Sequence, residues 1–475
     1  MRSIAVVVLG LCAVAGRAQE GAAWPQFHGP NGSGVAEGQK PPVEFGPNKN
    51  LKWKVKAPSG LSSPIVVGDK LVITAFEDGK LYTIAYGRAT GKEAWRQHAP
   101  AKKIEGYFKK GGSPAQSTPT TDGTRIYSFF GSCGLFCYDL AGKELWRYEM
   151  PTAVTSGNFG TGSSPVVADG LVVVVRDELK GSKILALDSA TGELRWQKAR
   201  LSPSSFTTPV VFGTGAEKQV VVASHARMIA YDLKTGAEKW FVTGTASGPC
   251  ATPVVADGMI YFAGWSPGPD DEMKMPTFEG LLKQLDKNKD GALEQSEMAK
   301  TPFEDFFEAW DTNKDGKVTR DEWDGLTKFM EEGKTGALAV KGGGQGDVTK
   351  THVLWKKTKG IPQVLSGIVY QGQYVMAKDG GLLTAYKTSG EPVYLQERTL
   401  PAGPYWASPV AANGHIYFTS YTDGAVTVLK AGASSPEVAA HNPGLGETAG
   451  ATPAIADDTL YLRTQGHWYA FSEKK

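Results

Sequence analysis

Cysteine is scarce in this sequence, and that scarcity limits the covalent chemistry that can hold the fold together. The 475-residue chain contains four cysteines: Cys12, Cys133, Cys137 and Cys250. A chain of this size with so few cysteines has no dense disulfide framework. Cys133 and Cys137 lie in one expected strand, about 13 Å apart at Cα, whereas a disulfide needs roughly 4.4–6.8 Å. We therefore expect buried free thiols.

An excess of charge of either sign is also missing. The 51 basic and 49 acidic side chains give a formal net charge of +2. Nucleic acid and anionic membranes select strongly basic surfaces, so the composition gives no reason to expect either partner. A hydrophobic fraction of 41% is ordinary for a globular protein and excludes a wholly disordered chain.

Long hydrophobic runs are absent except at the amino terminus. Met1-Arg2 forms a short positive start, residues 4–15 are apolar, and G-R-A at 16–18 offers small residues at −3 and −1 of a cut after Ala18. This is the pattern of a secretory signal peptide, and the run is shorter than the about 20 residues of a membrane helix. We expect residues 1–18 to be removed and the mature chain, with no membrane span, to be periplasmic or extracellular. A retained amino-terminal anchor is the alternative.

The chain does contain a repeated sequence motif, which is most complete in residues 163–196. It comprises a short apolar strand, a turn at Asp169-Gly170, a β-branched strand, a third strand ending at Asp188, and a turn at Thr191-Gly192 before a fourth strand with Trp196. Glycine supplies the positive φ of such turns, and aspartate caps their backbone. Four short strands joined by hairpins describe one antiparallel blade.

The motif recurs along the chain. A small residue and a proline open the units at Pro64, Pro119, Pro165, Pro209, Pro253, Pro409 and Pro453, with Gly367 in the equivalent place. Trp95, Trp146, Trp196, Trp240 and Trp355 close successive units as inter-blade packing residues, with Tyr394 substituting once. This pitch predicts an all-β fold, an eight-bladed β-propeller. The strand 51–56 should complete the last unit and close the ring, which removes two open sheet edges.

In two copies of the motif, one part has the sequence A-L-D-S-A-T-G-E-L-R-W or A-Y-D-L-K-T-G-A-E-K-W. They resemble the pyrroloquinoline-quinone (PQQ)-type propeller repeat, and the resemblance covers about residues 51–265 and 347–475. The lead W-P-Q-F-H-G-P-N-G-S-G from Trp24, within residues 19–50, is similar to the opening of exported bacterial members of this group. The resemblance also implies eight blades, but it does not fix the function.

Between successive unit starts one gap is far longer than the rest, which indicates an insertion at residues 266–346. Residues 270–334 hold 18 acidic and 10 basic side chains, and proline- and glycine-rich segments flank them. Two 12-residue loops stand inside, D-K-N-K-D-G-A-L-E-Q-S-E from Asp286 and D-T-N-K-D-G-K-V-T-R-D-E from Asp311. Both are identified as EF-hands, which predicts a small all-α insertion with two calcium sites.

Calcium prefers six to eight hard oxygen ligands, and the spacing of these loops wraps such oxygens around one point. The expected ligands are Asp286, Asn288, Asp290, Glu297 and the Ala292 carbonyl in the first loop, and Asp311, Asn313, Asp315, Glu322 and the Lys317 carbonyl in the second. Glu294 and Thr319 occupy position 9, and Leu293 and Val318 should pair as a short β-bridge. Apolar residues at helical spacing flank both loops, and Thr301-Pro302 should open a helix that runs through Trp310.

Catalytic patterns are weak. Quinoprotein alcohol dehydrogenases share this propeller type. Resemblance to them would imply a quinone cofactor held over a tryptophan ring, two adjacent cysteines, a catalytic Asp and a calcium ion inside the barrel. This chain has no adjacent cysteines, its seven histidines are scattered, and it has no nucleophile elbow or phosphate loop. We expect an exported calcium-binding platform for a protein or small-molecule ligand on a propeller face. A PQQ-dependent oxidoreductase and a periplasmic envelope-assembly factor are the alternatives.

Overall fold

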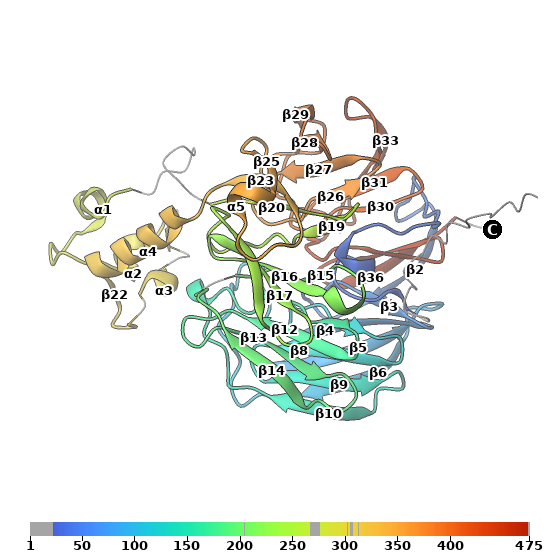
Figure 1. Cartoon of the computed structure of the whole chain (residues 1–475), viewed down its shortest axis with the longest axis horizontal. Coiled ribbons are helices and arrows are strands. Elements are labelled where there is room, and N and C mark those ends of the chain that lie inside the picture. The colour runs from blue at the N-terminus through green and yellow to red at the C-terminus, as the bar shows by residue number, and fades with distance from the viewer. Residues whose placement is uncertain are drawn as a thin grey trace, which may run out of the picture.

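The computed structural model describes residues 22–203, 205–266, 276–301, 303–304, 307–311 and 313–473. The expected signal peptide and Cys12 lie outside these residues. Eight antiparallel blades form a ring, which confirms the predicted eight-bladed propeller (Figure 1). No described helix is long and apolar enough to cross a membrane.

Each blade takes four strands in chain order, and its first strand lies innermost. The first four blades are β3 (Ile65–Val67), β4 (Lys70–Glu77), β5 (Lys80–Gly87) and β6 (Glu93–Ala99); β7 (Thr120–Thr121), β8 (Arg125–Phe130), β9 (Gly134–Asp139) and β10 (Glu144–Glu149); β11 (Val166–Ala168), β12 (Leu171–Arg176), β13 (Lys183–Asp188) and β14 (Leu194–Ala199); and β15 (Val210–Phe212), β16 (Gln219–Ser224), β17 (Arg227–Asp232) and β18 (Glu238–Thr243).

The other four blades complete the ring. They are β19 (Val254–Ala256), β20 (Met259–Gly264), β23 (Gly336–Lys341) and β25 (Val353–Lys357); β26 (Ile368–Tyr370), β27 (Gln373–Lys378), β28 (Leu382–Lys387) and β29 (Pro392–Arg398); β30 (Val410–Ala412), β31 (His415–Thr419), β32 (Val426–Lys430) and β33 (Val438–Asn442); and β34 (Ala454–Ala456), β35 (Thr459–Arg463) and β36 (His467–Phe471) with β2 (Leu51–Lys56). In this last blade β2 pairs antiparallel with β36, so the two ends of the propeller sequence share one sheet.

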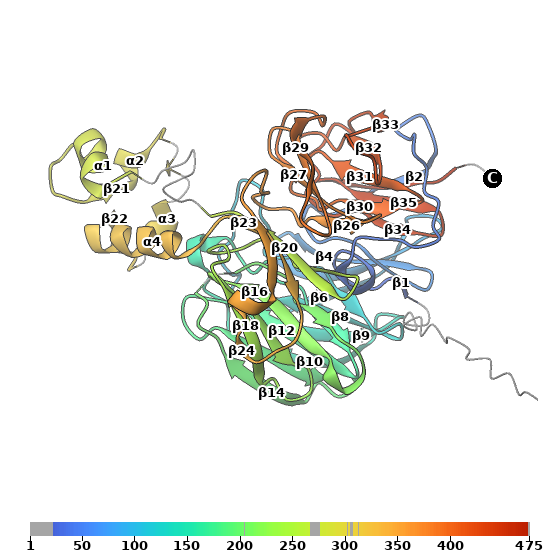
Figure 2. The same cartoon turned by 45° about the horizontal axis from the view of Figure 1, so that its top comes forward.

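The meander gives the ring two distinct faces. Turns between the first and second and between the third and fourth strands lie on one face, which we call the hairpin face. Turns between the second and third strands, and the links between blades, lie on the other, the connection face. The helical insertion leaves the fifth blade between β20 and β23, so it stands on the connection face. Figures 1 and 2 show it projecting from one side of the propeller, opposite the carboxy-terminal end.

A closed ring of hydrogen bonds joins the blades around the axis. In every blade a Ser or Thr just before the first strand accepts, through its hydroxyl, the backbone N–H of its counterpart in the preceding blade. The eight links are Ser63 N to Thr118 Oγ1, Thr118 N to Ser164 Oγ, Ser164 N to Thr208 Oγ1, Thr208 N to Thr252 Oγ1, Thr252 N to Ser366 Oγ, Ser366 N to Ser408 Oγ, Ser408 N to Thr452 Oγ1 and Thr452 N to Ser63 Oγ, all at 2.9–3.1 Å. The eighth link returns to the first blade.

The repeated tryptophans join neighbouring blades farther from the axis. The indole N–H donates to a carbonyl of the next blade in five places: Trp53 to Arg88, Trp95 to Leu140, Trp146 to Ser189, Trp196 to Leu233 and Trp355 to Thr388, at 2.9–3.1 Å. Each ring lies on a turn glycine of that blade; at Gly192, for example, a Cβ atom would approach the Trp146 ring to 2.7 Å. The predicted packing role of these tryptophans is therefore confirmed.

The lead segment enters the central channel from the hairpin face. β1 (Ala22–Trp24) pairs with β3, and the Pro25 carbonyl accepts the Thr121 N–H at 2.9 Å. The following 3₁₀ turn η1 (Pro30–Gly32) contacts β15 and β19. His28 is fully buried, and its Nε2 lies 2.8 Å from the Pro409 carbonyl oxygen. The segment thus touches innermost strands on opposite sides of the ring and plugs this end of the channel.

The hydroxyl ring generates a stability prediction. We expect Ser164→Ala to lower the free energy of unfolding by about 1–3 kcal/mol, because the buried Thr118 N–H loses its acceptor. Ser164→Thr keeps the hydroxyl and is the control, since four other places in the ring already hold Thr. Chemical denaturation at a fixed calcium concentration measures both. Equal losses in the two variants would show that the hydroxyl link has no special importance.

Candidate functional site

The inserted module packs around its own small apolar core. Its elements are α1 (Phe278–Leu285), β21 (Leu293–Glu294), α2 (Gln295–Met298), α3 (Phe307–Trp310), β22 (Lys317–Val318) and α4 (Arg320–Glu332). The Thr277 hydroxyl caps α1 by accepting the Gly280 N–H at 3.2 Å. Trp310 and Trp323 meet edge to face in the core, with ring centroids 4.9 Å apart. The helices on both sides of the two loops therefore share one interior.

One predicted helix differs from the structure. The helix expected from Thr301 through Trp310 is described only as α3, which begins at Phe307, while Pro302 and Phe306 lie outside the described residues. The Thr301 hydroxyl accepts the Phe303 N–H at 3.2 Å but also donates to the Met298 carbonyl at 2.6 Å. The residue expected to cap a new helix is thus also tied to the end of the preceding one.

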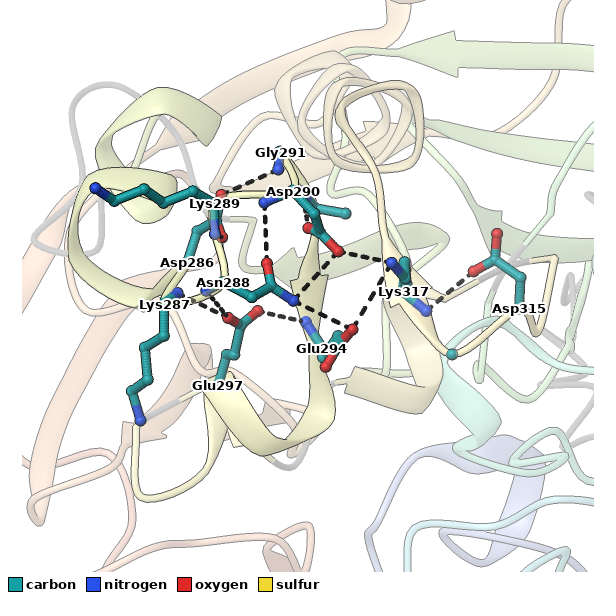
Figure 3. Close-up of polar contacts among 12 residues, drawn as sticks. Asp286, Lys287, Asn288, Lys289, Asp290, Gly291, Glu294, Glu297, Asp315 and Lys317 are labelled. Carbon is teal, nitrogen blue, oxygen red and sulfur yellow. Dashed lines mark hydrogen bonds and ion pairs between the residues drawn. The ribbon is translucent and has the colours of Figure 1, made fainter.

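The first loop has the backbone form that its sequence predicts (Figure 3). Asp286 accepts the N–H groups of Lys289 at 2.7 Å and Gly291 at 3.1 Å. Gly291 has a φ of 81°, the left-handed conformation that glycine adopts without strain. The Glu297 carboxylate spans the loop, accepting the Lys287 N–H at 2.7 Å through Oε1 and the Glu294 N–H at 3.0 Å through Oε2.

The second loop repeats this arrangement. Asp311 accepts the N–H groups of Asp315 at 3.1 Å and Gly316 at 2.9 Å, and Gly316 has a φ of 86°. Glu322 Oε1 accepts the Asn313 N–H at 3.2 Å, and its Oε2 accepts the Thr319 N–H at 2.9 Å. The two loops therefore share the bonds donated by the N–H groups of positions 3, 6 and 9, while the first aspartate accepts a further N–H from position 4 in one loop and from position 5 in the other.

A short antiparallel bridge holds the loops side by side. Leu293 pairs with Val318, as predicted, and Glu294 pairs with Lys317. The Leu293 and Val318 side chains are completely buried in the core of the module. The bridge places the position-7 and position-9 residues of the two loops opposite each other.

The donor set and backbone of both loops fit calcium, although the acidic side chains are not drawn together. Each loop offers carboxylate, amide and carbonyl oxygens, which are the ligands that calcium selects. Among the described residues, however, no three acidic, histidine or cysteine side chains converge as a closed metal cage. Glu297 and Glu322 accept backbone N–H groups of their own loops.

Electrostatics differ between the acidic residues of the first loop. Lys317 and the Ala292 N–H hydrogen bond to Asp290, and they lower the pKa of this carboxyl below its ordinary value. At Glu297, burial acts to raise the pKa, but the backbone N–H donors of Glu294, Lys287 and Asn288 outweigh it, so the pKa is lowered. Both side chains are therefore favoured as the carboxylates that metal chelation needs.

The module contacts the propeller where α4 ends. Glu332 lies on the connection face with Oε2 2.9 Å from His225 Nε2, and the Lys334 N–H donates to the Thr245 carbonyl at 2.8 Å. Between α4 and the propeller lies an open cleft of about 480 Å³, lined by Glu178, Leu179, Gly181, Ser182, Arg200, Leu201, Ser202, Pro203, His225, Gly325, Lys328 and Glu332. Leu201 is 92% exposed there. The cleft is thus built jointly by the two parts of the chain.

Residues 83–266 match the family model described as outer membrane protein assembly factor BamB, and residues 303–326 match the EF-hand model. The first loop, at 286–297, precedes the latter match. BamB of Nitrosomonas eutropha (strain DSM 101675 / C91 / Nm57) is 26% identical over 195 residues, which is 40% of this chain and 42% of that relative. The matched region thus spans less than half of the relative's length.

Solved structures show the same fold. BamB from Moraxella catarrhalis superposes with a TM-score of 0.54 at 13% identity, covering 89% of this chain and 99% of that one. A europium-containing methanol dehydrogenase gives a TM-score of 0.55 at 10% identity, covering 96% and 99%. These findings confirm the predicted PQQ-like propeller repeats and the inserted EF-hand. At such low identity, the structural likeness extends to the fold alone.

An aromatic pair lies on the connection face, beside the link into the seventh blade. Tyr421 lies against the indole of Trp406, with ring centroids 3.8 Å apart. A Cβ atom at Gly111, in the long link between the first two blades, would lie 2.8 Å from the same indole. Trp406 is thus packed against Tyr421 and against the link at Gly111.

The same link buries a carboxyl group that sequence reasoning missed. Glu105 is 3% exposed, its Oε2 accepts the Thr161 hydroxyl at 2.7 Å, and its Oε1 has no hydrogen-bond partner among the described residues. Burial raises the pKa of Glu105 to about 7. The sequence gives one signal for it: Glu105 is the single acidic residue in the polar, glycine-rich link 100–119.

Glu105 generates a pH prediction. Because its pKa is raised on folding, stability should fall as pH rises from about 4.5 through about 7, where the folded state must lose a proton that it binds tightly. We expect Glu105→Gln to remove this loss and to stabilise the protein at pH 8 by up to roughly 3 kcal/mol, with no gain near pH 4. Denaturation at the two pH values, with the exposed Glu193→Gln as control, measures the effect. An equal gain at both pH values would contradict it.

Proposed function

We propose that this protein is an exported, calcium-holding binding platform, in which an EF-hand pair binds two calcium ions beside the connection face of a propeller. The observation that carries the proposal is the pair of loops with one backbone pattern, joined by the Leu293–Val318 bridge. The proposed ligands are the ten residues expected from the sequence. Glu297 and Glu322 are the proposed bidentate ligands, because each stands at position 12 of its loop.

The proposed role of calcium is structural. Extracytoplasmic calcium modules typically bind at about 10⁻⁴–10⁻³ M, where the ion is abundant and steady. Glu322 lies near the start of α4 and Glu332 at its end, where it pairs with His225 of the propeller. An ion chelated by Glu322 would fix the start of the helix whose other end borders the cleft. Calcium would thereby hold the module in place beside a ligand surface.

Calorimetric titration of the full chain with calcium tests this proposal. We expect two sites in the wild type. Glu297→Gln and Glu322→Gln should each weaken one of them by roughly tenfold or more, because position 12 loses its bidentate carboxylate. Glu331→Gln removes an exposed charge from α4 and should leave both sites unchanged. No calcium-dependent heat in the wild type, or equal effects of all three substitutions, would contradict the proposal.

The partner on the connection face is proposed to be a protein. The partial sequence match to BamB, whose name describes assembly of outer membrane proteins, supports an envelope-assembly factor as the particular form of this platform. Crosslinking through a probe placed at the exposed Leu201 tests it, and capture of membrane-assembly proteins is the expected result. The quinoprotein alternative instead expects a stoichiometric spectral shift and dye reduction on addition of quinone.

A further inference from the structure

A lysine of the second loop reaches into the first. Lys317 Nζ lies 2.6 Å from Asp290 Oδ2 and 3.7 Å from Glu294 Oε1 (Figure 3). The backbone pairing of Lys317 with Glu294 fixes where this side chain starts. The bridge that holds the loops together therefore brings this side chain within reach of two carboxylates of the other loop.

The two carboxylates occupy ligand places of the first loop. Asp290 stands at position 5 and Glu294 at position 9, while Lys317 stands at position 7 of the second loop, where the backbone carbonyl is the expected ligand. One residue thus belongs to both sites. Its carbonyl oxygen serves the second loop, and its ammonium group occupies acidic oxygens of the first.

The arrangement is not reciprocal. The residue at position 7 of the first loop is Ala292, which has no cationic side chain to send toward the second loop. The bond from the position-3 amide to the position-5 carboxylate is common to both loops, at 3.3 Å from Asn288 to Asp290 and 3.0 Å from Asn313 to Asp315. A cation of the second loop therefore pairs with carboxylates of the first, and position 7 of the first loop sends no cation back.

The other lysines of the first loop do not share this position. Figure 3 shows the amines of Lys287 and Lys289 pointing away from the carboxylates, whereas Lys317 points between Asp290 and Glu294. An isolated exposed ion pair has little effect on stability. A cation that must leave before another cation can bind, however, opposes that binding directly.

We propose that Lys317 acts as an internal competitor of calcium at the first loop, so that the second loop fills first and the first loop fills only when the ammonium group is displaced. The proposal rests on the proposed calcium binding. It identifies the residue that sets the affinity difference between the sites, and it makes the first loop the weaker one. A single charge at this range predicts roughly a three- to thirtyfold difference in affinity.

Calcium titration of the full chain with two matched substitutions tests the proposal. Lys317→Met removes the ammonium group while retaining the apolar stem and the backbone carbonyl, and we expect it to tighten the weaker site by roughly three- to thirtyfold. Lys289→Met also removes one positive charge from the first loop, but the Lys289 amine points away from the carboxylates. This substitution should therefore change the affinity of that site less than about twofold. Lys317→Arg retains the charge and should resemble the wild type.

A second series assigns the sites and separates the two proposals. With the first loop disabled by Glu297→Gln, the remaining site should be the tight one, and adding Lys317→Met should leave it unchanged. Equal effects of Lys317→Met and Lys289→Met, or a tightening that persists in the Glu297→Gln background, overturn the competitor role while calcium binding stands. Absence of calcium binding in every correctly folded variant overturns both. Circular dichroism establishes that each variant is folded.

Discussion

The ring of Ser and Thr hydroxyls around the axis is the constraint on which the rest of this structure depends. Each hydroxyl accepts a buried backbone N–H from the preceding blade, and the last link, from Thr452 to Ser63, closes the ring of eight blades. The links lie just before the innermost strands, around the axis that the lead segment crosses. The insertion in the fifth blade lies between the second and third strands, so it emerges on the connection face.

The fifth blade differs from the others in a second place besides the helical insertion. In the other blades that carry the full tryptophan contact, the indole rests on a glycine of the next blade's turn. The fifth blade has the link 342–348 at this place, and its segment β24 (Gly346–Asp347) lies parallel to β18 of the fourth. Trp240 consequently donates to the Gln219 side chain at 2.7 Å within its own blade. The Trp240 indole therefore has a hydrogen-bond partner although it lacks the contact with a turn glycine.

Local spacing explains what the sequence could predict. The number of blades follows from the regular spacing of the repeat units along the chain. The EF-hand backbone follows from oxygen-bearing residues and a glycine at fixed intervals within each loop. The path of the lead segment was not predictable, because His28 meets Pro409 across the whole chain. The hydroxyl ring was within reach, since a Ser or Thr precedes the first strand of each unit. Its meaning, however, depends on neighbours about 44 residues away.

The side-chain contact of Lys317 is the clearest feature that the sequence motif does not predict. By position it is a carbonyl ligand, and at that position the motif ignores the side chain, so sequence alone makes the two loops equals. The pairing with Glu294 gives the side chain a direction, and Asp290 lies where it arrives. The same bridge that lets two loops share one core also lets a residue of one loop govern the charge of the other. Coupling between the proposed sites would therefore need no helix movement, because Lys317 belongs to the second loop and contacts the first.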